Sequence, residues 1–164
     1  MTEVSIRTAT KDDCGIILGF VRELAEYENL AHEIIATEEI LTQTMFGAHA
    51  YAESLIAEIN GKAVGFALFF HNFSTFIGRP GLYVEDVYVT PTYRHSGIGL
   101  KLFRALAKIA LQRDCGRMEW AVLDWNQPAI TFYEKIGAKP KPEWITQRLT
   151  RKEIQVLASS SLNP

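Results

Sequence analysis

The sequence predicts a mixed α/β domain, in which strands and amphipathic helices follow one another along the chain. Several segments carry apolar residues at helical spacing, and others are short apolar or alternating runs bounded by turn residues. The composition is that of an ordinary globular protein, because 48% of the 164 residues are hydrophobic and 22% are charged. A chain of this length can bury one sizeable core, so we expect a single domain over residues 1–164.

The first part of the chain is expected to contain one strand and two helices. Residues 4–7 alternate in polarity and predict a strand. Thr10 precedes acidic residues, as a helix N-cap does, and an apolar stripe at helical spacing then runs to about Tyr27. A second helix is expected to begin near Thr37, because two acidic residues follow it in what would be the first turn.

The middle of the chain is expected to form a hairpin and one further strand. Residues 54–59 and 62–70 predict two strands, and Asn60-Gly61 between them is a strong signal for a tight hairpin turn. Residues 71–81 contain Ser, Thr, Gly and Pro and predict a loop or a broken strand end. Residues 82–89 then predict a strand that ends before Pro91.

The last part of the chain is expected to hold two helices and two strands. A helix is predicted over residues 97–111 and a buried strand over residues 118–123. Residues 128–136 predict a short helix with proline at its start and Gly137 as its C-cap. Residues 144–149 alternate and predict a final strand, and residues 159–164 are expected to be a frayed tail.

Composition excludes several classes of function. The net charge is −2 and the sequence has no basic run, so we expect no nucleic-acid partner. No apolar run reaches membrane-spanning length and the N-terminus has no apolar signal core, which predicts a cytoplasmic protein with no membrane partner. Cys14 and Cys115 have no CxxC spacing, so neither a metal site nor a disulfide framework is indicated.

A glycine-containing loop is the strongest functional signal. Residues 93–99 follow the predicted strand 82–89 and place two glycines at the entrance of the next helix. Such a loop can direct backbone N–H groups and a helix N-terminus at a phosphate group. The alternative is a strand-to-helix turn that uses glycine for geometry alone. With the carboxylate pair Glu85-Asp86 upstream as a candidate general base, the segment suggests a transferase that uses a phosphate-bearing cofactor.

The element order and the pattern Arg94-x-x-Gly97-x-Gly99 resemble the GNAT superfamily of acyl-CoA N-acetyltransferases. The resemblance extends from Ile6 to Trp144 and is strongest to the branch of diamine (spermidine/spermine) and thialysine N-acetyltransferases. Four segments carry the resemblance: residues 23–28, 82–86, 121–126 and 132–138. It implies a central, mostly antiparallel twisted sheet flanked by helices. It also implies direct transfer of acetyl from acetyl-CoA to a primary amine in a ternary complex.

The resemblance further implies which residues contact coenzyme A. The backbone N–H groups of Val87 and Val89 would pair with the pantetheine amides and polarise the thioester carbonyl. His95 stands where this branch usually has glycine, and it is either a bystander in the loop or a phosphate contact. The full set of expected cofactor contacts is Val87, Tyr88, Val89, Arg94, His95, Ser96, Gly97, Ile98, Gly99, Leu100, Asn126, Ala129, Tyr133 and Lys135.

The chemistry requires a base and is helped by an acid. A primary alkylamine has an ordinary pKa near ~10.4, so it must lose a proton before it can attack. Glu85 is the candidate base, and the Tyr133 hydroxyl is the candidate donor to the departing thiolate. Because Glu85 and Asp86 are adjacent on a strand, we expect their side chains to point to opposite faces. The alternatives are an edge strand with solvated carboxylates and a Tyr133 that only packs.

The acceptor is expected to be a small-molecule amine. Its candidate contacts are Tyr27, Glu28, Glu85, Asp86 and Glu143. Ser74-Thr75 lies where polyamine enzymes tend to carry an acidic residue, which favours a lysine-like amino acid or a diamine over long polyamines. A protein lysine or N-terminus as acceptor, and a non-catalytic acyl-CoA-binding module, remain alternatives. The branch also implies a homodimer that packs C-terminal strands, here residues 144–149, across its two-fold axis.

Overall fold

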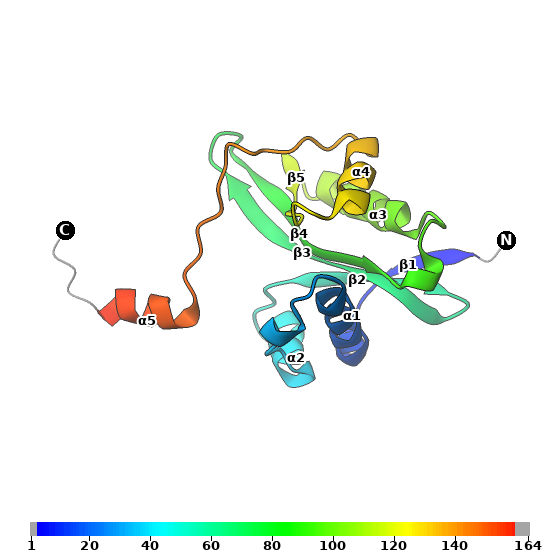
Figure 1. Ribbon diagram of the computed structural model, residues 1–164, viewed down its shortest axis with the longest axis horizontal. Helices are drawn as coiled ribbons and strands as arrows, with labels where there is room; N and C mark the ends of the chain where they lie inside the picture. The colour runs from blue at the N-terminus through cyan, green and yellow to red at the C-terminus, as the bar shows by residue number, and fades with distance from the viewer. Residues whose placement is uncertain (1–2, 160–164) are drawn as a thin grey trace. The chain divides into compact units, whose positions relative to one another are not determined.

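A computed structural model describes residues 3–159 of the chain (Figure 1). The contacts between residues divide the chain into two compact units, with the division between Ala121 and Val122. We describe each unit by itself. Of the predicted frayed tail, Ser159 is the last residue of a helix, and residues 160–164 lie outside the described residues.

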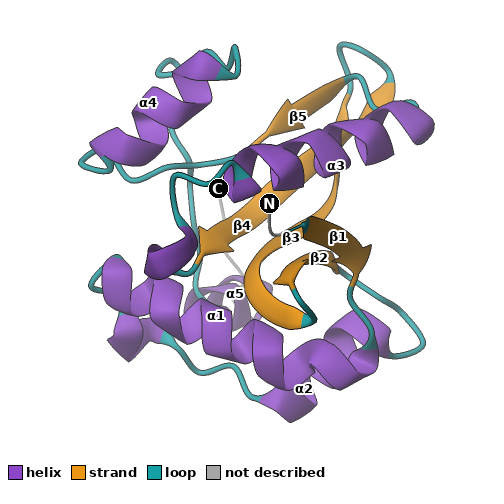
Figure 2. Cartoon of the chain, turned by 90° about the vertical axis from the view of Figure 1, so that its right-hand side faces the viewer, coloured by secondary structure: helices purple, strands orange, loops and turns teal. Residues whose placement is uncertain are grey.

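The first unit is built on a five-stranded sheet in the order β1-β2-β3-β4-β5. Its pairs are antiparallel except β4 with β5, which is parallel, so the predicted mostly antiparallel sheet is confirmed. Figure 2 shows its pronounced twist. The strands are β1 Val4–Thr8, β2 Glu53–Ile59, β3 Lys62–Ser74, β4 Arg79–Val89 and β5 Arg117–Glu119.

Helices cover both faces of this sheet (Figures 1 and 2). One face packs against α1 (Cys14–Tyr27) and α2 (Glu38–Phe46), and the other packs against α3 (Ile98–Gln112). Buried apolar side chains fill each layer, with Phe20, Phe66 and Tyr88 on the α1 side. None of the helices within residues 3–159 has the length and apolarity that crossing a membrane requires.

An ion-pair network holds the first strand against the start of α1. The Asp13 carboxylate accepts hydrogen bonds from both terminal nitrogens of Arg7, at 2.7 and 2.8 Å, and from the Thr10 N–H at 2.7 Å. These bonds lower the pKa of Asp13 to about 2. The predicted cap at Thr10 is confirmed, but it opens a short 3₁₀ turn, η1 (Lys11–Asp13), before α1 begins.

The hairpin after β3 is longer than the sequence predicts. Residues 71–81 do not form a loop, because the ladder continues through Asn72 opposite Gly81 to Ser74 opposite Arg79. Polar side chains do not end a ladder whose backbone groups still pair. The turn is confined to residues 75–78 and ends at Gly78, whose φ is +69°. β5 is conversely shorter than the predicted strand over residues 118–123.

The second unit contains α4 (Gln127–Lys135) and α5 (Arg151–Ser159). The predicted strand over residues 144–149 is wrong, because no ladder within the described residues includes it. A strand needs a hydrogen-bonding neighbour, and the described part of one chain supplies none for this segment. The sequence does carry the signal for α5, since Glu153 accepts from the Thr150 N–H at 2.6 Å, as in a capping box.

Candidate active site

A β-bulge at Glu85 interrupts β4. Leu68 of β3 pairs with Asp86, and the next residue of β3, Phe69, pairs with Val84, so Glu85 is the extra residue. A bulge of this kind changes which face the following side chains occupy. Val84 lies in the core beneath α3, as do Val87 and Val89 after the bulge.

The bulge overturns the expectation that Glu85 and Asp86 point to opposite faces. Tyr88 lies in the core on the α1 side, so Asp86, two residues before it, shares that side. Val84 lies beneath α3, so Glu85, the next residue, points to the α1 side as well. Its charge raises the pKa of both Tyr83 and Asp86. The inserted residue therefore lets two adjacent carboxylates serve one site.

Three carboxylates gather at this point, and we call Glu28, Glu85 and Asp86 the carboxylate cluster. Burial, followed by the charges of Glu85 and Glu28, raises the pKa of Asp86 to about 6. Burial also raises the pKa of Glu28, the residue that caps the C-terminal end of α1. Among the ion pairs of residues 3–159, none involves any of the three.

The carboxylate cluster is suited to an organic cation. Closely spaced carboxylates without a cation cost free energy, and an ammonium group placed among them would reverse that cost. A metal ion is a poorer candidate, because within the described residues no group of three His, Cys, Asp or Glu side chains is arranged to hold one. An amine therefore fits this end of β4 by charge.

The loop after β4 has the geometry of an anion-binding helix start. His95 has φ +63° and Gly97 has φ +82°, so the chain turns through two left-handed residues to enter α3. The first helical hydrogen bond runs from the Lys101 N–H to the Gly97 carbonyl at 3.0 Å. The N–H groups of the three residues between them have no helical acceptor, as at every helix start: Ile98, Gly99 and Leu100.

The same loop is held in place by its side chains. The Ser96 hydroxyl donates to the Tyr93 carbonyl at 2.5 Å, and the Arg94 Nε donates to the Val89 carbonyl at 2.9 Å. A methyl group built on Gly97 would meet nothing within 4 Å, so open space faces this part of the loop. Backbone donors, open space and a helix N-terminus fit the pyrophosphate of coenzyme A.

The end of β4 offers a free strand edge beside that loop. On one edge β4 pairs with β3 as far as Gly65 opposite Val89, but on the other edge it pairs with β5 only at residues 81–83. Among the described strands, none pairs with that second edge from Val84 onward. An extended chain of amides such as pantetheine can pair with an open strand edge. The predicted roles of Val87 and Val89 stay predictions that fit this geometry.

Contacts that the sequence does not predict join α1 to this loop. The guanidinium of Arg94 lies 4.9 Å from the centre of the Tyr27 ring and 5.4 Å from that of Tyr88. Glu23, on the same helix as Tyr27, forms a hydrogen bond with Tyr88, and burial together with this bond raises the pKa of Tyr88. No local pattern signals the contacts with α1, because Tyr27 is 67 positions from Arg94 and Glu23 is 65 positions from Tyr88.

The remaining predicted residues belong to the second unit. The Asn126 side chain accepts from the Ala129 N–H at 3.4 Å, which makes Asn126 the N-cap of α4. The Tyr133 ring lies 5.6 Å from the ring of Phe132, and Lys135 is in the last turn of the helix. Glu143 pairs with Lys141 at 2.7 Å, an ion pair of exposed groups. The predicted roles of these residues in binding and catalysis stay predictions.

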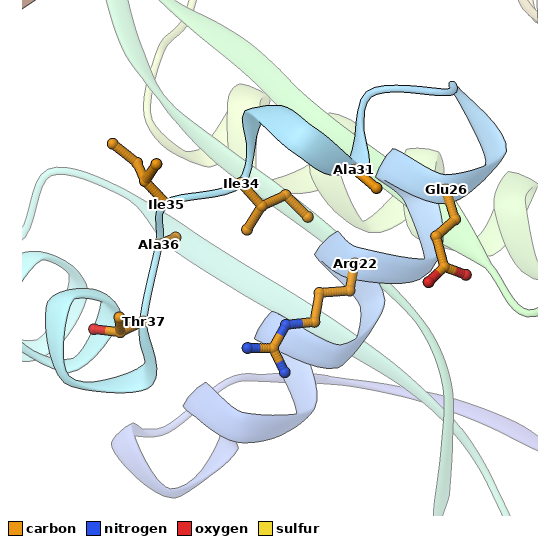
Figure 3. Close-up of a pocket in the computed structure, with 7 residues that line it drawn as sticks. All are labelled: Arg22, Glu26, Ala31, Ile34, Ile35, Ala36 and Thr37. Carbon is orange, nitrogen blue, oxygen red and sulfur yellow. The ribbon is translucent and has the colours of Figure 1, made fainter.

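A separate hollow lies between α1 and the segment that leads to α2 (Figure 3). Its volume is about 450 Å³, and none of the predicted site residues lines it. Figure 3 shows Arg22 pointing from α1 toward that segment. The lining residues are Arg22, Glu26, Ala31, Ile34, Ile35, Ala36 and Thr37.

Comparison with solved structures shows the same fold. An integron cassette protein from the mobile metagenome of V. cholerae superposes with a TM-score of 0.81 and is 29% identical, covering 98% of this chain and 99% of its own. An aminoglycoside N-acetyltransferase, AAC(6')-Iy in complex with CoA, has a TM-score of 0.73 at 18% identity and covers 91% of this chain and 96% of its own.

Comparison of sequences shows the family. Thialysine N-epsilon-acetyltransferase of Mus musculus is 37% identical over 96% of this chain and 99% of its own length. L-ornithine N5-acetyltransferase NATA1 of Arabidopsis thaliana is 30% identical over 93% of this chain and 86% of its own. The profile of the Acetyltransferase (GNAT) family matches residues 17–138, a range that crosses the division between the two units. The chain therefore belongs to the GNAT family and is an N-acetyltransferase that uses acetyl-CoA.

Proposed function

We propose that the protein acetylates a primary amine of a small molecule that carries one or two positive charges, a lysine-like amino acid or a diamine. The carboxylate cluster is the observation that carries this proposal, because it gathers negative charge at the bulge of β4 with no cation from the described residues paired to it. The names of the relatives, thialysine and L-ornithine acetyltransferases, support an amino acid with a side-chain amine.

In this proposal the protein's own groups bind the amine and move its proton. Glu28 and Asp86 hold the ammonium form by charge, and a carboxylate oxygen of Glu85 takes the proton that the amine must lose. Acetyl-CoA, when bound, supplies the activated acetyl thioester. The N–H groups at the start of α3 hold its phosphates, and those of Val87 and Val89 direct hydrogen bonds at its amides and carbonyl.

The Tyr133 hydroxyl completes the set as the group that gives a proton to the departing sulfur. Both substrates are bound together, so that attack is direct and no acetylated protein residue forms. Tyr133→Phe tests this role, because it removes only the hydroxyl and keeps the ring beside Phe132. We expect kcat to fall about tenfold or more while the domain stays folded. Turnover at the wild-type rate would remove Tyr133 from the mechanism.

The experiment that tests the function is a free-thiol assay with acetyl-CoA against a panel of amines. The panel contains thialysine, lysine, ornithine, short diamines, spermidine, spermine and an aminoglycoside. We expect thiol release to be fastest with the lysine-like amino acids or the short diamines. Preference for spermine would contradict the proposed acceptor class. Binding of acetyl-CoA without release for any amine would contradict a small-molecule acceptor and direct the search to protein amines.

We also propose a homodimer formed through residues 144–149. This segment has apolar residues at both ends and lacks a ladder within the described chain, while Trp144 and Ile145 are 71% and 80% exposed. A second copy that packs against this segment would cover these side chains. Light scattering after size-exclusion chromatography is expected to give twice the monomer mass. Trp144→Asp, which places a charge on this exposed apolar segment, is expected to lower it. A monomeric wild-type protein would contradict the dimer.

A further inference from the structure

The side chain of Arg94 joins three parts of the first unit. Its Nε donates to the carbonyl of Val89, the last residue of β4, at 2.9 Å. Its guanidinium lies 4.9 Å from the Tyr27 ring at the end of α1 and 5.4 Å from the Tyr88 ring. Its own backbone belongs to the loop that enters α3. This side chain thus links the phosphate loop, to which its backbone belongs, to the strand end and the helix end.

The contact of Arg94 with Tyr88 also connects the loop to α1. Tyr88 forms a hydrogen bond with Glu23, which lies one helical turn before Tyr27. Arg94 therefore contacts α1 directly through Tyr27 and indirectly through Tyr88 and Glu23. The residue after Tyr27 is Glu28, which caps α1 and acts electrostatically on Asp86. Arg94 therefore contacts Tyr27, the residue directly before Glu28 of the carboxylate cluster.

We propose that Arg94 is a positioning residue that couples the cofactor loop to the acceptor site through Tyr27 and the end of α1. This inference rests on the proposed function, since the acceptor site is taken to be the carboxylate cluster. The Nε of Arg94 donates to the Val89 carbonyl, and its guanidinium lies over two aromatic rings. These contacts hold the loop against α1. Coenzyme A bound at the loop then favours the arrangement of α1 that binds the amine, and the amine favours coenzyme A equally.

Arg94→Lys tests the coupling with the charge retained. A lysine ammonium cannot donate from a planar group to Val89 while it covers two aromatic rings. We expect the KM for thialysine to rise about fivefold, with a smaller change in kcat. Calorimetry gives the Kd of coenzyme A with and without thialysine, and we expect the ratio of the two values to fall toward one in the variant.

Tyr27 variants test whether the coupling passes through α1. Tyr27→Leu removes the aromatic face, and we expect it to reproduce the effect of Arg94→Lys and to weaken coenzyme A binding about threefold, although Tyr27 belongs to α1. Tyr27→Phe keeps the aromatic face that Arg94 covers, so the ratio of the two coenzyme A Kd values should be retained. The double variant Arg94→Lys/Tyr27→Leu should be no worse than the more impaired single variant, because both remove one shared contact.

Arg113→Lys is the matched control. Arg113 also lies over an aromatic ring, 5.9 Å from the centre of Phe69, and pairs with Glu53 away from the loop. We expect it to lower thermal stability slightly and to leave KM and the Kd ratio unchanged.

Two results would overturn the coupling. The first is an Arg94→Lys variant that weakens coenzyme A binding with no change in the thialysine KM or the Kd ratio, which would make Arg94 a cofactor ligand only. The second is additivity in the double variant. If wild type acetylates no amine, the proposed function fails separately. The affinity of Tyr27→Leu for coenzyme A then still tests whether α1 supports the loop. An affinity equal to that of wild type would reject the contact between α1 and the loop as a support of cofactor binding.

Discussion

The bulge at Glu85 and the turn at Gly97 are both departures from regular backbone, but they arise from different causes. At Gly97 the chain has φ +82°, a conformation that glycine adopts at little cost, so the residue type itself produces the turn. At Glu85 the departure comes from pairing, because Leu68 and Phe69 of β3 pair with Asp86 and Val84 and leave Glu85 out. One irregularity depends on a residue and the other on a partner strand.

The two regions also differ in the charge that they offer. The start of α3 directs N–H groups outward and suits an anion, whereas the bulge gathers Glu85, Asp86 and Glu28 and suits a cation. A transferase that binds a phosphate-bearing donor and an ammonium-bearing acceptor needs both. Substitutions at the loop should therefore act on coenzyme A binding, and substitutions at the bulge should act on the amine and its proton.

The largest effect is expected from Gly97→Val. A β-branched residue at φ +82° is strained, which costs roughly 1–2 kcal/mol or more, and its side chain would occupy the open space before the helix start. We expect coenzyme A affinity to fall about a hundredfold or beyond detection. Calorimetric titration with coenzyme A checks this, and unchanged affinity would reject the phosphate-loop assignment.

Gly78→Val is the matched control for that strain. Gly78 has φ +69° and also has nothing within 4 Å of a built methyl group, but it lies in the turn between β3 and β4. Both variants should lose similar thermal stability, and Gly78→Val should keep coenzyme A affinity. Equal losses of affinity in the two variants would mean that backbone strain, and not the cofactor site, explains the first result.

Glu85→Gln should impair the chemistry at the bulge and leave cofactor binding at the loop intact. The amide keeps the shape of the side chain but cannot accept the amine proton, so we expect kcat to fall about a hundredfold and the basic side of the pH profile to shift. Coenzyme A affinity should stay nearly the same. Glu119→Gln is the control, since Glu119 also acts on Tyr83 but comes from β5. A fully active Glu85→Gln would show that Glu85 is not the base.

Asp86→Asn should raise stability at neutral pH. The pKa of Asp86 is raised from 3.8 to about 6 in the folded protein, so its ionised form destabilises the fold above pH 6. That penalty, at most about 3 kcal/mol, is relieved as the pH falls from 6 to 4. Urea unfolding should find the variant more stable than wild type at pH 7.5 and equal to it at pH 4. A variant that is less stable at pH 7.5 would contradict the burial of an unpaired carboxylate.

The same contrast explains what the sequence could predict. The loop was recognisable because Arg94, Gly97 and Gly99 stand in a local pattern, and the strand and helix around it follow from apolar periodicity. The faces of Glu85 and Asp86 were predicted wrongly because a bulge depends on the register with β3, about 17 residues away in sequence. The strand predicted at residues 144–149 was wrong for a related reason, since an alternating pattern does not supply a partner strand.

The smallest effect is expected from Glu28→Gln, at the acceptor side of the site. Glu28 acts on Asp86 through charge alone, so removing its charge should matter most for an acceptor with a second cation. We expect the KM for 1,4-diaminobutane to rise about threefold and the KM for butylamine to change less. Glu33→Gln is the control, because Glu33 is exposed and pairs with His32. Equal changes in the KM of both amines would mean that Glu28 supports the end of α1 and does not interact with the second charge of the acceptor.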